Sequence, residues 1–157
     1  MSLVHLHLLL NHVPVIGIVF VALVLLAALR MQHGGDVSRL GLLLLVGVGA
    51  VAAAVYFTGE PAEDAVERIA GVSRAVIHQH EEAAEAAFIG AAITAGFALL
   101  ALFRYRRREL PRAVTGAMLV FTLVVSGLMA WTANLGGQIR HSEIRTTTTQ
   151  ADGEVDR

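Results

Sequence analysis

The chain has 157 residues, of which 55% are apolar and only 16% are charged, and its mean hydropathy is +0.65. Soluble domains contain about 25% charged residues, so this balance indicates an integral membrane protein. The net charge of −1 gives no indication of nucleic-acid binding. The sequence has no cysteine, which excludes disulfides, thiolate metal ligands and a cysteine nucleophile.

Four long stretches contain no charged residue: 13–29, 40–57, 86–103 and 113–135. Each is close to the roughly 18 to 20 residues that cross about 30 Å of hydrocarbon as a helix. Their apolar character is continuous rather than alternating, which excludes the strands of a barrel. We therefore predict an all-α fold, a four-transmembrane-helix bundle within residues 1–145. Its helices should lie at about 13–30, 40–57, 83–104 and 113–135.

The distribution of arginine predicts the orientation of this bundle. The loop after the first helix carries Arg30 and Arg39, and the segment 104–112 carries five arginines. The segment 58–85 instead contains seven acidic residues and two arginines. Because arginine-rich loops stay in the cytoplasm, we expect a multi-pass protein of the bacterial inner (cytoplasmic) membrane, N-out and C-out. The acidic segment should then face the periplasm or exterior.

Residues 61–82 predict an extracytoplasmic amphipathic helix between the second and third spans. Pro61 is typical of a helix start, and Glu63 lies in the favourable first turn. Apolar residues then recur with a helical period at Val66, Ile69, Val76 and Ile77. The C-terminal residues 146–157 have no apolar pattern, and we expect them to be a disordered tail.

The stretch "HQHEEAAEAAF", residues 78–88, combines histidine and glutamate just before an apolar span. At about 100° per residue, His80 continues the apolar stripe of this segment, with Glu81 at its edge. His78, Glu82 and Glu85 fall on the other side. His80 is therefore the better inward-facing ligand, and the other three form either a second site or a solvated face.

Histidine collects on the predicted outer side of the membrane. Six of the seven histidines lie there: His5, His7, His12, His78, His80 and His141. Neutral imidazole is a common metal ligand and also binds haem iron axially. Pro14 suits the first turn of a helix, so His12 should lie at the bundle mouth and His7 on a preceding interfacial segment. The simpler alternative is that histidine is tolerated at interfaces and that helix packing alone brings the rings together.

Two further features are compatible with a cofactor. Small residues dominate 47–54 and 83–92, which allows close helix packing or leaves space for a flat macrocycle. Arg140 follows the glycine pair 136–137 and precedes His141. Its guanidinium could pair with a haem propionate, or it could contact lipid headgroups.

The spacing His7-x4-His12-x-Pro14 resembles the N-terminal motif of a family of uncharacterised bacterial four-helix integral membrane proteins. Further similarities are Thr58 and Gly59, His80, and the pattern "GG-x-IRH-x-E" from Gly136 to Glu143. Leu8 departs from the family, in which many members have proline at that position. Some members look to be fused to cytochrome-type domains, which implies redox work near the outer surface. The resemblance nominates His7, His12, His80 and His141.

Three functions follow as hypotheses. The first is electron transfer through haem b or another redox metal at the extracytoplasmic end, with two of His12, His80 and His141 as ligands. His7 would be a further ligand or a supporting residue, and Arg140 a further contact. The second is a non-haem Zn, Fe or Cu site made by His12, His80, Glu81 and His141. The third is a structural or partner subunit without a cofactor.

Enzymatic motifs are poorly represented. "HEEAA", residues 80–84, begins like the zinc-binding H-E-x-x-H helix, but Ala84 replaces the second histidine. The sequence contains no hydrolase or transferase motif, so electron transfer is favoured over catalysis. Besides the lipid bilayer, we expect a redox partner protein or a second copy of the chain, and no nucleic acid.

Overall fold

The computed structural model describes residues 2–67 and 72–145, and every element in these ranges is helical. The elements are α1 (Leu3–Leu10), α2 (His12–Arg30), α3 (Gly35–Phe57), α4 (Gly59–Val66), α5 (Arg74–Arg104), α6 (Arg112–Arg140) and the short 3-10 helix η1 (Ser142–Ile144). Four helical stretches of 28 to 32 residues are long and apolar enough to cross a membrane. The predicted all-helical chain with four potential spans is confirmed.

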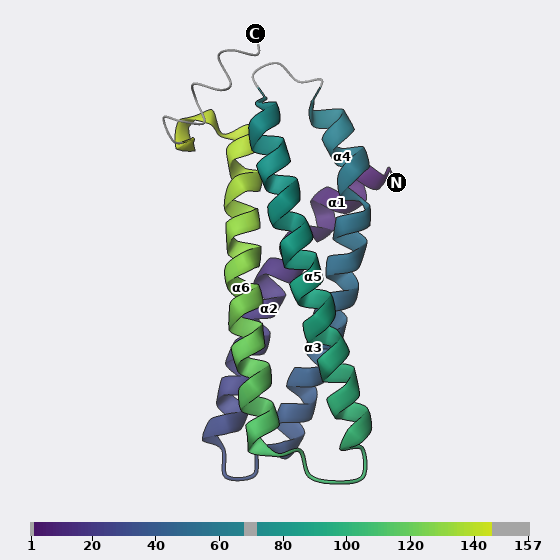
Figure 1. Ribbon diagram of the computed structural model, residues 1–157, viewed down its shortest axis with the longest axis vertical. Helices are drawn as coiled ribbons and strands as arrows, with labels where there is room; N and C mark the ends of the chain where they lie inside the picture. The colour runs from purple at the N-terminus through teal and green to yellow at the C-terminus, as the bar shows by residue number, and fades with distance from the viewer. Residues whose placement is uncertain (1, 68–71, 146–157) are drawn as a thin grey trace.

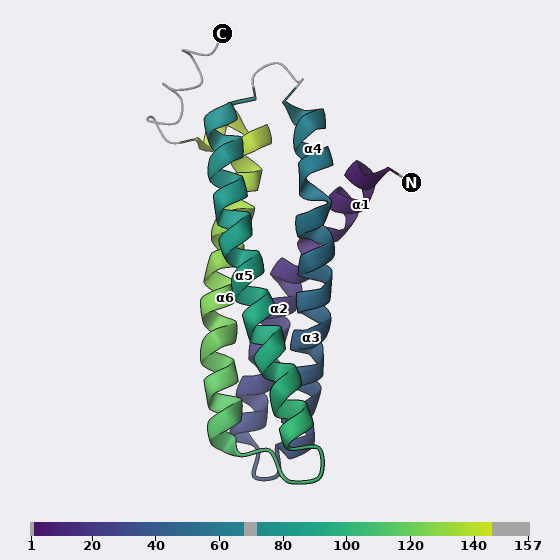
Figure 2. The ribbon, with the colours of Figure 1, turned by 45° about the vertical axis from the view of Figure 1, so that its right-hand side comes forward.

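The four long helices form an antiparallel bundle (Figure 1). Each packs against two neighbours in the cyclic order α2, α3, α5, α6. The loops 31–34 and 105–111 lie together at one end, which we call the loop end. The helices α1 and α4, the start of α5 and the end of α6 lie at the other end, which we call the terminal end (Figures 1 and 2).

Apolar side chains occupy both the interior and the outer surface of the bundle. Leu25 and Leu42 are fully buried between helices, whereas Phe20 and Leu100 are more than 60% exposed. An outer surface of this kind would be unfavourable in water and is suited to hydrocarbon. The chain is therefore a multi-pass membrane protein whose helices contact the lipid bilayer.

Small residues hold the helices close together. A Cβ placed on Gly49 of α3 would lie 2.6 Å from the Cβ of Ala95 on α5. Likewise, a Cβ on Gly41 would lie 2.5 Å from a methyl group of Leu25. At both glycines, these contacts favour close helix packing over space for a flat macrocycle.

The predicted outer helix over 61–82 is replaced by two separate segments. Residues 59–66 form α4, whereas 74–82 are the first part of α5, which continues without interruption to Arg104. The helix α3 ends at Phe57, with Thr58 as its C-cap, and α4 follows directly. The hydroxyl of Thr58 donates to the carbonyls of Ala54 and Val55 in the last turn of α3. Nothing between 74 and 104 breaks a helix strongly, since this stretch has no proline. Residues 68–71 and the predicted disordered tail 146–157 lie outside the described residues.

Replacing Gly49 with valine should lower the free energy of unfolding by about 1–3 kcal/mol, because the new methyl groups collide with α5. Gly47→Val is the matched control, since a Cβ at Gly47 meets nothing within 4 Å. Thermal unfolding in detergent measures the difference. Equal unfolding temperatures for the two variants would contradict the close contact between α3 and α5.

Candidate functional site

The terminal end carries histidines from several elements. His5 and His7 lie on α1, His78 and His80 lie on the first turns of α5, and His141 follows α6. The helix α2 has only 19 residues against 31 in α5, so α1 lies beside the upper part of the bundle and packs against α3 and α4 (Figure 2). His7 and His80 differ from the others because each ring donates to a backbone carbonyl of another helix.

His7 attaches α1 to the end of α3. Its Nδ1 lies 3.0 Å from the carbonyl oxygen of Val55 and 3.4 Å from the hydroxyl of Thr58. A carbonyl oxygen only accepts hydrogen bonds, so Nδ1 of the ring must donate the proton. In the neutral ring, Nε2 then keeps its lone pair.

His80 makes an equivalent contact between α5 and α6. Its ring is half-buried, and Nδ1 donates to the carbonyl oxygen of Thr132 at 3.0 Å. Gly136 gives the ring its space, because a Cβ there would lie 3.1 Å from Cε1 of His80. Nε2 of His80 is therefore also the nitrogen that keeps its lone pair.

His7 and His80 lie at the same end of the bundle, on α1 and α5, and they contact α3 and α6, the two helices that pack on either side of α5. We call them the His7–His80 pair. Each ring is fixed by a hydrogen bond from Nδ1 to a backbone carbonyl of a different helix, Val55 of α3 and Thr132 of α6. Histidines that bind metals or haem iron are commonly held in this way, with the second nitrogen fixing the ring and its tautomer.

The other predicted ligands are not brought together. His12 is exposed at the start of α2, and Glu81 is exposed on α5. His141 is exposed and donates from Nδ1 to the carboxylate of Glu143 at 2.9 Å. Within the ranges that the structure describes, no group of three His, Asp or Glu side chains converges as a metal ion requires. The set His12, His80, Glu81 and His141 therefore does not form one cluster.

Glu143 explains why His141 lies away from the bundle. Its pKa is lowered, first by a hydrogen bond from its own backbone N–H and then by His141. A carboxylate with a lowered pKa stabilises this local arrangement at neutral pH, and the contribution is lost as the pH falls through the lowered value. Arg140, the predicted propionate partner, is exposed at the last turn of α6.

The predicted faces of α5 are confirmed. His80 is half-buried, and Val76 and Ile77 beside it are buried. The side chain of His78 is 71% exposed, and its Nε2 lies 3.5 Å from the carboxylate of Glu82. Glu85 is also exposed. This environment favours a solvated face over a second site.

Sequence reasoning missed a carboxyl pair at the same end. Glu63 on α4 and Glu81 on α5 are close enough to interact, and their like charges disfavour ionisation of both carboxyls at once. Glu81 directly follows His80, so the carboxyl pair adjoins the His7–His80 pair. No sequence signal relates Glu63 to Glu81, because they lie on two different helices.

Aromatic rings also gather at the terminal end. The rings of Tyr56 and Phe88 are stacked with centroids 4.6 Å apart, which joins α3 to α5. Phe57 contacts both rings edge-on. Tyr56 and Phe57 directly precede Thr58, which contacts His7, so the aromatic group adjoins this histidine.

Comparison with known proteins identifies no relative of this chain. No family model, no curated protein and no solved structure matches it. The resemblance carried by His7, His12 and Pro14 therefore stays a sequence-based prediction.

Removing the His7 ring should loosen α1. His7→Ala deletes a partly buried hydrogen bond worth about 1 kcal/mol, so the amides of 3–10 should exchange hydrogen roughly fivefold faster. His7→Asn should retain slow exchange, because its side-chain amide can donate to Val55. His5→Ala is the control, since His5 is exposed and bonds only to Ser2 within α1. Hydrogen exchange followed by mass spectrometry in detergent measures the rates, and equal rates for His7→Ala and His5→Ala would contradict the docking contact.

Proposed function

We propose that the chain is a membrane electron-transfer protein that holds haem b at its terminal end, with His7 and His80 as axial ligands. The observation that carries the proposal is the His7–His80 pair. Both rings donate from Nδ1 to a carbonyl and keep a lone pair on Nε2. Bound haem would supply an iron that accepts and releases one electron at a time.

The donor set suits haem better than a bare metal ion. A porphyrin provides four nitrogen ligands, so the protein needs to add only two. Structural and catalytic zinc sites take three or four ligands from the protein. The described part of the chain offers no group of three, whereas it offers two imidazoles that are fixed in the same way at one end of the bundle.

Surrounding groups would tune and protect the ligands. The carbonyls of Val55 and Thr132 fix the ring orientations and raise the basicity of each Nε2. The stacked rings of Tyr56 and Phe88 would add apolar surface beside the ligands. The mutual repulsion of Glu63 and Glu81 favours protonation of one of them, which would limit the negative charge beside His80.

Absorption spectroscopy of the purified protein tests this proposal. The protein, as isolated or after addition of haem, should show a Soret band that shifts on reduction with dithionite. His80→Ala and His7→Asn should each abolish the low-spin spectrum, since asparagine preserves the docking of α1 but cannot replace the imidazole ligand. His78→Ala, His12→Ala and His141→Ala should retain it, because these residues are exposed and lie outside the pair.

Two results would overturn the proposal. One is a protein that stays colourless after haem addition. The other is an equal loss of the band in His78→Ala and His80→Ala. Stoichiometric zinc, iron or copper in a colourless protein would instead support the non-haem site, and a metal-free colourless protein would support a structural or partner subunit.

We also propose that the terminal end faces the periplasm or exterior of a bacterial inner membrane. The support is the arginine content of the loop end, which carries the segment 104–112. A redox partner would then dock on the extracytoplasmic side.

Cysteine labelling measures this orientation directly, because the chain has no cysteine of its own. In intact cells, a membrane-impermeant maleimide should label Glu60→Cys and should leave Gln32→Cys unlabelled until the membrane is permeabilised. Both positions are exposed and lie at opposite ends of the bundle. Labelling of Gln32→Cys alone would reverse the orientation.

A further inference from the structure

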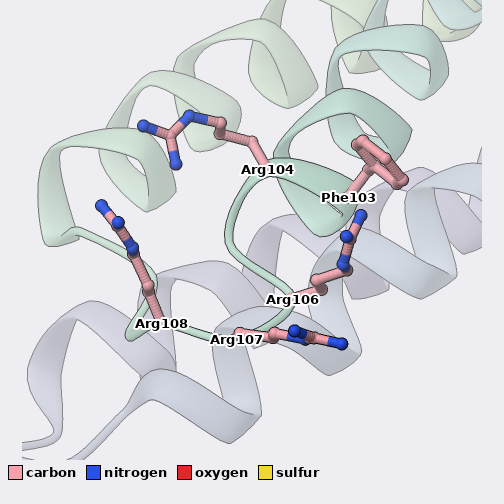
Figure 3. A pocket seen from close by; sticks show the side chains of 5 residues that line it. All are labelled: Phe103, Arg104, Arg106, Arg107 and Arg108. Carbon is pink, nitrogen blue, oxygen red and sulfur yellow. The ribbon is translucent and has the colours of Figure 1, made fainter.

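The loop end contains a hollow lined mainly by arginine. It has a volume of about 220 Å³ and is formed where α5 ends and the loop 105–111 begins. Its lining residues are Phe103, Arg104, Arg106, Arg107 and Arg108 (Figure 3). Arg104 and Arg108 extend to one side in this view, and Arg106 extends along the ring of Phe103.

Two other arginines hold this loop in shape. Arg39 of α3 donates to the carbonyl oxygens of Tyr105 and Arg108, both at 2.6 Å. Arg112 of α6 donates to the carbonyls of Met31 and Leu29 in the neighbouring loop. Both guanidiniums donate to carbonyls at or just beyond the C-terminal ends of α5 and α2. The arginines of the hollow are therefore presented on a braced loop.

The hollow concentrates positive charge, and none of the ion pairs in the described ranges involves one of its arginines. The ion pairs found in the described ranges all lie at the terminal end, on Arg74, His78 and His141. Four neighbouring guanidiniums repel one another, and a bound anion relieves this repulsion. Arginine is especially suited to phosphate, because its planar fork donates two parallel hydrogen bonds.

Apolar surface lies directly beside the charge. Phe103 is the last residue of an uncharged span, and its ring is 67% exposed. The guanidinium of Arg106 lies over this ring, 4.4 Å from its centroid. The exposed side chains of Leu99 and Leu100 continue the apolar surface along α5. A ligand that fits both parts has a phosphate at one end and a hydrocarbon chain at the other.

We propose that this hollow binds the headgroup of an anionic phospholipid. The lipid phosphate would lie among Arg104, Arg106, Arg107 and Arg108, and an acyl chain would lie against Phe103 and the outer face of α5. Basic pockets beside transmembrane helices recognise acidic lipids by this combination of charge and depth. Such a site is independent of the haem proposal, because it lies at the opposite end of the bundle.

Native mass spectrometry of the full chain in detergent tests the site, since micelles remove any effect of membrane orientation. Phosphatidylglycerol or diphosphatidylglycerol should remain bound at about one lipid per chain, and phosphatidylethanolamine should be lost. At about a factor of five per arginine, Arg107→Gln with Arg108→Gln should weaken binding of the anionic lipid roughly thirtyfold.

Arg30→Gln with Arg74→Gln is the matched control. It removes the same charge from two exposed positions outside the hollow and should retain the lipid. Equal weakening by both double variants, or equal retention of phosphatidylethanolamine, would overturn the proposal. Displacement of the lipid by millimolar inorganic phosphate would also overturn it, since the hollow would then bind a free anion and not a lipid.

Discussion

Hydrocarbon provides no hydrogen-bond partner for a backbone N–H or C=O group, and this constraint determines the rest of the structure. It requires continuous helices through the bilayer, and it confines most charged and many polar side chains to the two ends. Within the spans, specificity depends on shape, as where Gly49 allows α3 to approach Ala95. The ends are therefore where chemistry can be located.

At both ends of the bundle, side chains from one element donate to backbone carbonyls of another, but the consequences differ. Helix carbonyls near a C-terminus lack helical partners, and polar side chains from other elements supply them. At the loop end, Arg112 donates to Leu29 near the end of α2. At the terminal end, His7 donates to Val55 near the end of α3, whose carbonyl also accepts from the hydroxyl of Thr58. A guanidinium used in this way only stabilises the chain, whereas an imidazole still has a second nitrogen available for a ligand.

The sequence predicted the parts of the structure that follow from local composition. Uncharged length identified the four spans, and helical periodicity distinguished half-buried His80 from exposed His78. The second histidine with an anchored ring could not be chosen in this way. His12 precedes a span but is exposed, whereas His7 is anchored on Val55 through the fold of α1 against α3 and α4.

The same limit explains the outer segment and the carboxyl pair. A period of 3.6 residues indicates a helix but not where one helix ends and the next begins, so the pattern predicts 61–82 as one unit. In the structure, its first part follows α3 and its last part begins α5. The interaction between Glu63 and Glu81 joins these two helices, and a local pattern cannot predict it.

The position of His7 on α1 links the stability of this helix to the proposed cofactor. An isolated helix of eight residues is unstable in water, so α1 depends on its contacts with α3 and α4. Nδ1 of His7 makes one of these contacts, and Nε2 of the same ring would bind the iron. Because both interactions require the docked helix, each should strengthen the other. The binding of haem would then order the N-terminal segment, and a loosely docked α1 would weaken haem affinity even with both histidines present.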